Sequence, residues 1–138
     1  MPRLIAHIDG GGPVASGDIF LGVTMADLDT GEVVAEHSLA LGPGTVNEAE
    51  YSALILALYQ AEEFGATELV VKSDSKLIVN QMNGGWAIHK NHLKEYADEA
   101  KAVIGRMRHG SLKRFRLEWV PREQNAEADR LSRVPRVK

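Results

Sequence analysis

Four acidic residues occupy positions from which their carboxylates could act together. Asp9 and Asp74 each follow a short apolar segment that predicts a strand, and strand ends in open α/β sheets form the crevice where catalytic groups collect. Helical spacing places Glu50 on an apolar stripe that should pack on the sheet, and Asp129 lies in residues 125–131, a predicted helix. Each also has an ordinary explanation. Asp9 and Asp74 can be turn or cap residues, Glu50 can extend its carboxylate to solvent, and Asp129 can be an acid on the surface of a helix.

A cluster of these four carboxylates would need a counter-charge. Two unit charges about 4 Å apart repel by roughly 4 kcal/mol at an effective dielectric constant of 20, so four ionised carboxylates require bound cations or large pKa shifts. Hard divalent cations with oxygen ligands, Mg²⁺ above all, meet this need. Two such ions about 4 Å apart suit in-line hydrolysis of a phosphodiester. The acids therefore predict a metal-dependent phosphodiesterase site, provided that the fold gathers them.

The elements that would position these residues predict an α/β fold. Thr45 and Glu48 form a capping-box pattern at the start of a helix, and Gly65 is typical of its end. Three leading strands joined by tight turns, followed by strands that alternate with helices, favour a mixed sheet with helices on both faces. The expected strands are residues 4–8, 19–26, 33–41, 68–73 and 113–120, and the expected helices are residues 45–64, 75–82, 91–107 and 125–133. Since no repeat or linker interrupts the chain, we expect a single domain over residues 1–138.

Composition narrows the class of protein. The 138 residues are 44% hydrophobic and 25% charged, values typical of a globular protein. The absence of cysteine excludes a disulfide scaffold, a thiolate metal site and a cysteine nucleophile, and agrees with a cytoplasmic location. No apolar run is long enough to predict a membrane span.

Charge is distributed unevenly along the chain. Up to Val71 there are one basic and 11 acidic residues, whereas from Lys72 onward there are 15 basic and 8 acidic residues, for a net charge of −3. This asymmetry indicates a basic surface opposite an acidic one, unless the charges mix in space once the chain folds.

Four segments, in order, each contain one of the four candidate acids: residues 8–10 (IDG), 47–54 (NEAEYSAL), 73–79 (SDSKLIV) and 119–131 (WVPREQNAEADRL). Together they resemble type 1 ribonuclease H, the family that cuts the RNA strand of RNA–DNA hybrids, and the resemblance covers nearly the whole chain. It implies a ribonuclease H-like fold: a five-stranded mixed sheet, with the second strand antiparallel to the rest, and helices on both faces. It also implies that two Mg²⁺ or Mn²⁺ ions are bound by the catalytic residues Asp9, Glu50, Asp74 and Asp129.

The resemblance also implies contacts with the nucleic acid. Asn47 matches a position that contacts the sugar-phosphate backbone of the hybrid. The other substrate-facing positions are occupied by Gly10, Ser75 and Asn125.

One further segment matches a substrate-binding position of the family, and another departs from the family pattern. Residues 84–90 (GGWAIHK) match a segment that approaches the DNA strand, which would make Trp86 and Lys90 substrate contacts. Trp86 can also be read as a core or hinge aromatic residue. Many family members carry a histidine before the last helix; this chain has none there, and Arg122 or Glu123 is the candidate substitute.

The expected function is sequence-nonspecific endonucleolytic cleavage of RNA in RNA–DNA hybrids, giving 5′-phosphate and 3′-hydroxyl ends, by a monomer that contacts no membrane. Two alternatives stay open: a related nuclease acting on double-stranded RNA, and a non-catalytic module that binds hybrids. Retention of all four acids argues against the second, because without metal such a cluster only destabilises the fold.

Overall fold

Five strands form one sheet in the computed structural model, which describes residues 2–85, 87–88 and 91–133. The strands are β1 (Arg3–Gly11), β2 (Asp18–Asp27), β3 (Val33–Pro43), β4 (Glu68–Ser73) and β5 (Arg114–Trp119). The helices are α1 (Val46–Glu63), α2 (Lys76–Met82), α3 (Asn91–His109) and α4 (Ala126–Leu131), with a short 3₁₀ turn, η1 (Arg122–Gln124), before α4.

The sheet has the mixed topology expected from the sequence. Its strand order is β3-β2-β1-β4-β5, and β2 runs antiparallel to both of its neighbours, whereas β1, β4 and β5 are parallel. Short connections join β1, β2 and β3, which permits antiparallel pairing, while β4 and β5 are reached through crossovers that contain helices. The prediction that only the second strand is antiparallel to the rest is therefore confirmed.

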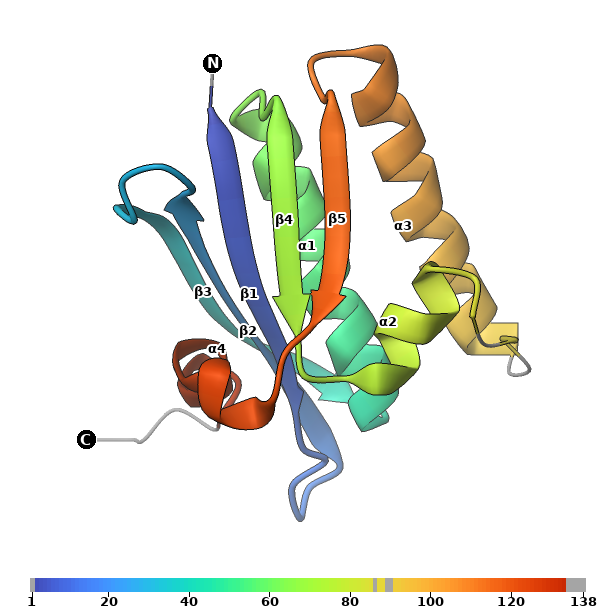
Figure 1. The fold of residues 1–138 in the computed structure, drawn as a ribbon. Helices are drawn as coiled ribbons and strands as arrows, with labels where there is room; N and C mark the ends of the chain where they lie inside the picture. The colour runs from blue at the N-terminus through green and yellow to red at the C-terminus, as the bar shows by residue number, and fades with distance from the viewer. Residues whose placement is uncertain (1, 86, 89–90, 134–138) are drawn as a thin grey trace.

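Helices cover both faces of this sheet, as expected (Figure 1). Helix α1 packs on one face against β1, β2 and β4, and α3 packs beside α1. Helix α4 lies on the opposite face, against β1 and β2 (Figure 1). The main apolar core therefore lies between the sheet and the two helices α1 and α3. Glu50 on α1 and Asp129 on α4 approach the sheet from opposite faces (Figure 1).

Local signals in the sequence fix the bounds of α1. The Thr45 hydroxyl accepts a hydrogen bond from the Glu48 backbone N–H at 3.2 Å, and the Glu48 carboxylate accepts one from the Thr45 N–H at 2.8 Å. These two bonds satisfy donors that a helix N-terminus leaves without partners. Gly65 follows the last turn with φ of +69°, a conformation that favours glycine. The capping box predicted from the sequence is confirmed.

Two element boundaries differ from the sequence prediction near the acids. Strand β1 continues to Gly11, because its last residues still pair with β2, so Asp9 lies within the strand and not after it. The last helix is shorter than the expected residues 125–133: α4 comprises Ala126–Leu131, with Asn125 and Ser132 as its caps. A 3₁₀ turn, η1, precedes it at residues 122–124.

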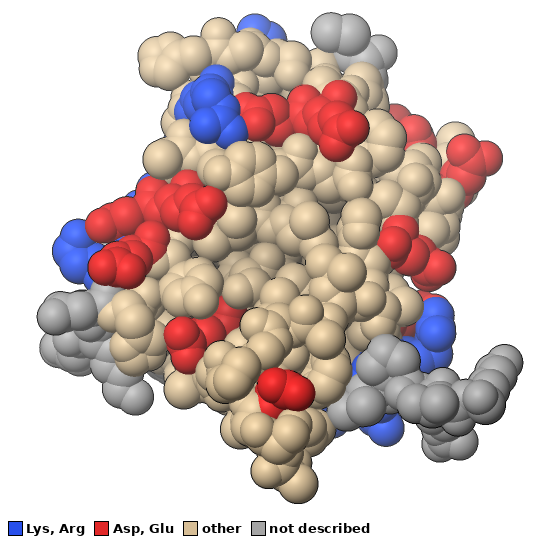
Figure 2. All heavy atoms as spheres, turned by 180° about the vertical axis from the view of Figure 1, so that it is seen from behind, with Lys and Arg blue, Asp and Glu red and all other residues tan. Residues whose placement is uncertain are grey.

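The surface charge is partly segregated. Figure 2 shows the side turned away from the viewer in Figure 1, where clusters of Asp and Glu are exposed and Lys and Arg are few. Mixing also occurs, because basic residues from the second half of the chain pair with acids of the first half, as Arg106 does with Glu62 at 2.6 Å.

No helix in the described ranges is long and apolar enough to cross a membrane.

Candidate active site

Three carboxylates from separate elements meet at one end of the sheet. Asp9 in β1, Glu50 in α1 and Asp74 directly after β4 each offer an oxygen, and these three oxygens lie within 4.8 Å of one another. The sheet register explains why Asp9 and Asp74 meet: β1 and β4 are adjacent and parallel, with Ile8 opposite Ser73, so the residues that follow lie side by side. The sequence prediction that these three acids are brought together is supported by this geometry.

Glu50 reaches the cluster because α1 packs unusually close to β1. A Cβ atom placed on Gly10 would lie 2.5 Å from the backbone nitrogen of Glu50, a separation that side chains do not tolerate. Glycine at this position therefore lets the helix backbone touch the strand and brings the glutamate beside Asp9. Gly10, expected to face the substrate, lines the pocket and also makes this contact possible.

Burial makes two of the carboxyls hard to ionise. Asp9 and Glu50 are only 5% and 6% exposed. Burial, together with the charge of Asp74, raises the pKa of Asp9 to about 7. Burial, followed by the charges of Asp9 and Asp74, raises the pKa of Glu50 to about 9. Among the described residues, the Glu50 Oε2 atom has no hydrogen-bond partner although it is buried, so the site favours a proton or a cation at this oxygen.

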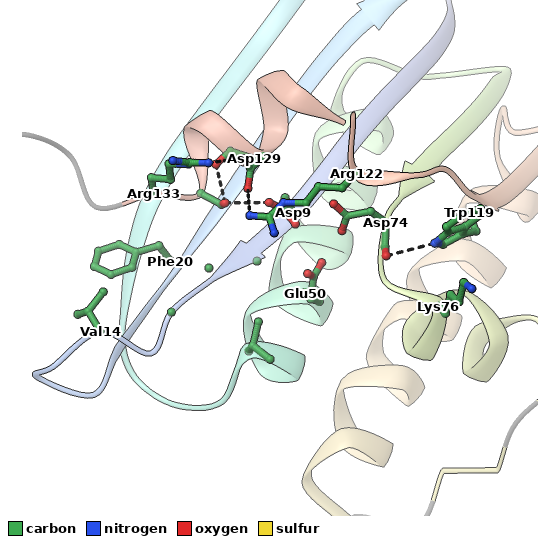
Figure 3. A pocket seen from close by; sticks show the side chains of 15 residues that line it. Asp9, Val14, Phe20, Glu50, Asp74, Lys76, Trp119, Arg122, Asp129 and Arg133 are labelled. Carbon is green, nitrogen blue, oxygen red and sulfur yellow. Dashed lines mark hydrogen bonds and ion pairs between the residues drawn. The ribbon is translucent and has the colours of Figure 1, made fainter. Parts of the chain in front are cut away.

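Asp129 lines the same pocket but is held differently (Figure 3). One of its oxygens lies 3.3 Å from Arg122 and the other lies 2.8 Å from Arg133. Burial opposes its ionisation, but the hydrogen bonds from Arg133 and Asp9 and the charges of the two arginines outweigh burial and lower the pKa of Asp129. The structure therefore gathers three of the expected acids and places the fourth at the edge of the pocket, paired with arginines.

The pocket around these acids is a large open cavity of about 970 Å³. Its side near α2 is formed by Trp119 and Lys76 (Figure 3). The Trp119 indole N–H donates to the backbone oxygen of Asp74 at 3.2 Å, and the Lys76 ammonium lies 4.9 Å from the centre of the indole ring. Sequence reasoning gave neither residue a role, although Lys76 lies within the segment 73–79 and Trp119 begins the segment 119–131, both of which resemble the family.

Two of the expected substrate residues lie near the cluster without joining it. Asn47 lies in the first turn of α1, one turn before Glu50, and is partly buried. Ser75 is the N-cap of α2, where its hydroxyl accepts from the Ile78 N–H at 3.3 Å. Glu123 is exposed in η1.

Asn125 differs from its expected role. It is 1% exposed, and its side-chain amide donates to the carbonyl oxygen of Ile8 at 2.8 Å. The structure therefore makes it an internal link between α4 and β1 instead of a surface contact for substrate. Trp86 and Lys90, the other expected substrate residues, lie outside the described residues.

The donor set suits a hard divalent cation. All three clustered ligands are carboxylate oxygens, the type that Mg²⁺ and Mn²⁺ prefer. A cation would also supply the partner that the buried Glu50 Oε2 lacks, and it would offset the carboxylate repulsion that, after burial, raises the pKa of Asp9 and Glu50.

Comparisons with known proteins agree with this fold. A family model described as reverse transcriptase-like matches residues 13–134. The bifunctional protein Rv2228c of Mycobacterium tuberculosis is 40% identical over 131 residues, which are 94% of this chain and 34% of that protein. The chain thus spans about a third of the length of this curated relative.

Two solved ribonuclease H structures match over almost their whole length. The crystal structure of RNase H1 from the halophilic archaeon Halobacterium salinarum aligns with a TM-score of 0.85 and 31% identity, covering 94% of each chain. LC11-RNase H1, solved in complex with an RNA/DNA hybrid, aligns with a TM-score of 0.79 and 34% identity over 94% of this chain and 93% of that one. Because the identities are 31% and 34%, the coverage is nearly complete and the topology is shared, the chain belongs to the ribonuclease HI family.

Proposed function

We propose that this chain is an endonuclease that hydrolyses the RNA strand of RNA–DNA hybrids without sequence specificity, leaving 5′-phosphate and 3′-hydroxyl ends. The observation that carries the proposal is the cluster of Asp9, Glu50 and Asp74, two of them buried, at the wall of an open pocket. Family membership supports it, as does the hybrid bound to LC11-RNase H1, a 34% identical relative.

The proposed cofactor is a pair of Mg²⁺ or Mn²⁺ ions. Asp9, Glu50 and Asp74 would hold them, with Asp129 as the fourth ligand. Bound ions of this kind generate a hydroxide nucleophile at neutral pH and stabilise the departing oxygen.

The residues around the cluster have separate tasks. Ser132 and the arginine pair hold Asp9 and Asp129 in place, since both carboxylates accept hydrogen bonds from them. Lys76, Arg122 and Arg133 line the pocket and place positive charge where a phosphate backbone would enter. Contacts to phosphates and sugars carry no sequence information, which accounts for the proposed lack of specificity.

Selectivity for RNA would come from groups that meet the 2′-hydroxyl and the A-like minor groove. We assign this task to Gly10, Asn47 and Ser75, which lie in β1, at the start of α1 and at the start of α2. Arg122 and Glu123 remain the proposed auxiliary residues, and Arg122 is the one that lines the pocket.

A cleavage assay tests the proposal. Labelled RNA–DNA hybrid, double-stranded RNA and single-stranded RNA are incubated with the protein and Mg²⁺ or Mn²⁺. Cleavage of the hybrid's RNA strand alone supports the proposal; cleavage of duplex RNA indicates the related nuclease, and binding without cleavage indicates a hybrid-binding module.

A pair of variants assigns the activity to the site. Asp74→Asn should abolish cleavage and leave the fold intact, because it removes one clustered charge. Asp98→Asn is the matched control, since Asp98 is exposed on α3 and pairs only with Lys94 among its described neighbours. Activity retained by Asp74→Asn would refute the role of this residue.

The cytoplasmic location and the monomeric state stay predictions.

A further inference from the structure

Helix α4 is bounded at both ends by buried polar side chains. It has six residues, Ala126–Leu131, and its N-cap Asn125 and C-cap Ser132 are 1% and 2% exposed. A helix this short is not stable alone. Its position, and with it the position of Asp129, must therefore be set by contacts with the sheet.

Both caps bind consecutive residues of β1. The Asn125 amide donates to the carbonyl oxygen of Ile8 at 2.8 Å. The Ser132 hydroxyl lies 3.0 Å from Asp9 Oδ2 and 2.8 Å from the backbone oxygen of Asp129, so its single hydrogen can be donated to either acceptor. Ser132 thus touches one expected metal ligand through its carboxylate and another through its backbone.

Two glycines bring the helix backbone directly onto the strands. A Cβ atom on Gly22 would lie 2.2 Å from the carbonyl oxygen of Ala128, and one on Gly11 would lie 2.2 Å from that of Ser132. Since no side chain separates α4 from β1 and β2 at these points, there is little freedom for the helix end to shift. The Ser132 hydroxyl is therefore held at a fixed place beside Asp9.

We propose that Ser132 is a positioning residue for the metal site: its hydroxyl orients the Asp9 carboxylate and couples it to the segment that carries Asp129. The inference rests on the metal-dependent function proposed above. Ser132 does not touch the reacting atoms in this assignment. It removes the rotational freedom of Asp9, as outer-shell partners of metal ligands commonly do, and loss of such a partner typically costs 10- to 100-fold in metal affinity.

The test compares Ser132→Ala with Ser111→Ala. Ser111, in the segment between α3 and β5, is a matched control, because its hydroxyl also donates to a buried residue, at the Ala66 carbonyl oxygen 3.0 Å away. For each protein, Mn²⁺ binding is measured by calorimetry, and the melting temperature is measured in EDTA and in Mn²⁺. Hybrid cleavage then gives kcat and KM as the metal concentration is varied.

Ser132→Ala should weaken Mn²⁺ binding by roughly tenfold and reduce the rise in melting temperature that Mn²⁺ causes. The metal concentration for half-maximal cleavage should rise by the same factor, while KM for the hybrid at saturating metal should not change. Ser111→Ala should lose stability in EDTA but keep the wild-type response to Mn²⁺. A merely structural role for Ser132 would make the two variants alike.

Equal Mn²⁺ affinity in Ser132→Ala and Ser111→Ala would overturn the inference. If Ser132→Ala fails to fold, Ser132→Cys replaces it, since it keeps a similar side-chain volume but donates only weakly, and it should show a smaller loss of metal affinity in the same direction. A wild-type protein that binds Mn²⁺ but does not cut the hybrid would refute the proposed function alone. The metal-affinity comparison would still decide the role of Ser132.

Discussion

Without divalent cations, the stability of this fold should fall as the pH rises, and Glu50→Gln should remove part of that fall. Burial raises the pKa of Glu50 to about 9, with the charges of Asp9 and Asp74 as further causes. Burial, with the charge of Asp74, likewise raises the pKa of Asp9 to about 7. In the unfolded chain, both carboxyls would titrate near pH 4.

The sign of the effect follows from proton binding. Between about pH 4 and the raised pKa values, the folded state holds protons that the unfolded chain has released, so the free energy of unfolding decreases as the pH rises. Below about pH 4 both states are protonated and the effect vanishes. A tenfold change in proton affinity corresponds to about 1.4 kcal/mol. The raised pKa of Asp9 alone therefore corresponds to about 4 kcal/mol lost by about pH 9. Glu50 adds to this loss, so it is a large part of the typical stability of a domain.

Urea unfolding in EDTA, followed by circular dichroism at about pH 5, 7 and 9, measures this effect. Glu63→Gln is the control, because Glu63 is an exposed carboxylate on the same helix. The wild type and Glu63→Gln should lose stability in parallel, whereas Glu50→Gln should show a shallower decline, and Mn²⁺ should restore the stability of the first two at high pH. A pH dependence in Glu50→Gln equal to that of the wild type would refute the reasoning.

Three further changes test the packing that supports the site, each by urea unfolding. Gly22→Ala should destabilise the protein by about 1–3 kcal/mol or more, because its methyl group would meet the Ala128 carbonyl oxygen at 2.2 Å; unchanged stability would show that α4 is not seated so closely. Thr45→Ala should cost about 1 kcal/mol by breaking the capping box, and no loss would mean that solvent replaces the cap. Tyr51→Phe should cost about 1–3 kcal/mol, since the Tyr51 hydroxyl donates to the buried Gln81 carboxamide oxygen at 2.6 Å; a neutral result would contradict that bond.

The parts of the structure that the sequence predicted are those with local signals. The capping box at Thr45 begins α1, and the helical period then puts Glu50 on the buried stripe. Asp9 and Asp74 were recognised from the ends of short apolar runs, and parallel pairing of β1 with β4 brings such ends together. The helical periodicity, the capping box and the ends of the apolar strands are all patterns of residues close together in the sequence. The cluster of three carboxylates could therefore be predicted from the sequence.

The features that the sequence did not predict depend on tertiary packing. Asn125 matches a substrate-facing position of the family, yet it is buried in the interior, where its side chain binds β1. Ser132 and Arg133 follow α4, whose close packing on Gly11 and Gly22 is a tertiary contact that no local pattern specifies. The pairing of Asp129 with arginines likewise depends on how η1 and α4 turn, and no local pattern specifies that turn.

The site thus consists of two halves with different requirements for binding a cation. In the half built by β1, α1 and β4, Asp9 and Glu50 have raised pKa values and must release protons before they act as ligands. In the half carried by α4, Asp129 has a lowered pKa and must instead be released by its arginines. Ser132 joins the two halves, because its hydroxyl contacts both Asp9 and the backbone of Asp129. Raising the pH acts on the first half and removing Arg133 acts on the second, but Ser132 and the hydrogen bond between Asp9 and Asp129 connect them, so the effects of the two changes on metal affinity should not be additive.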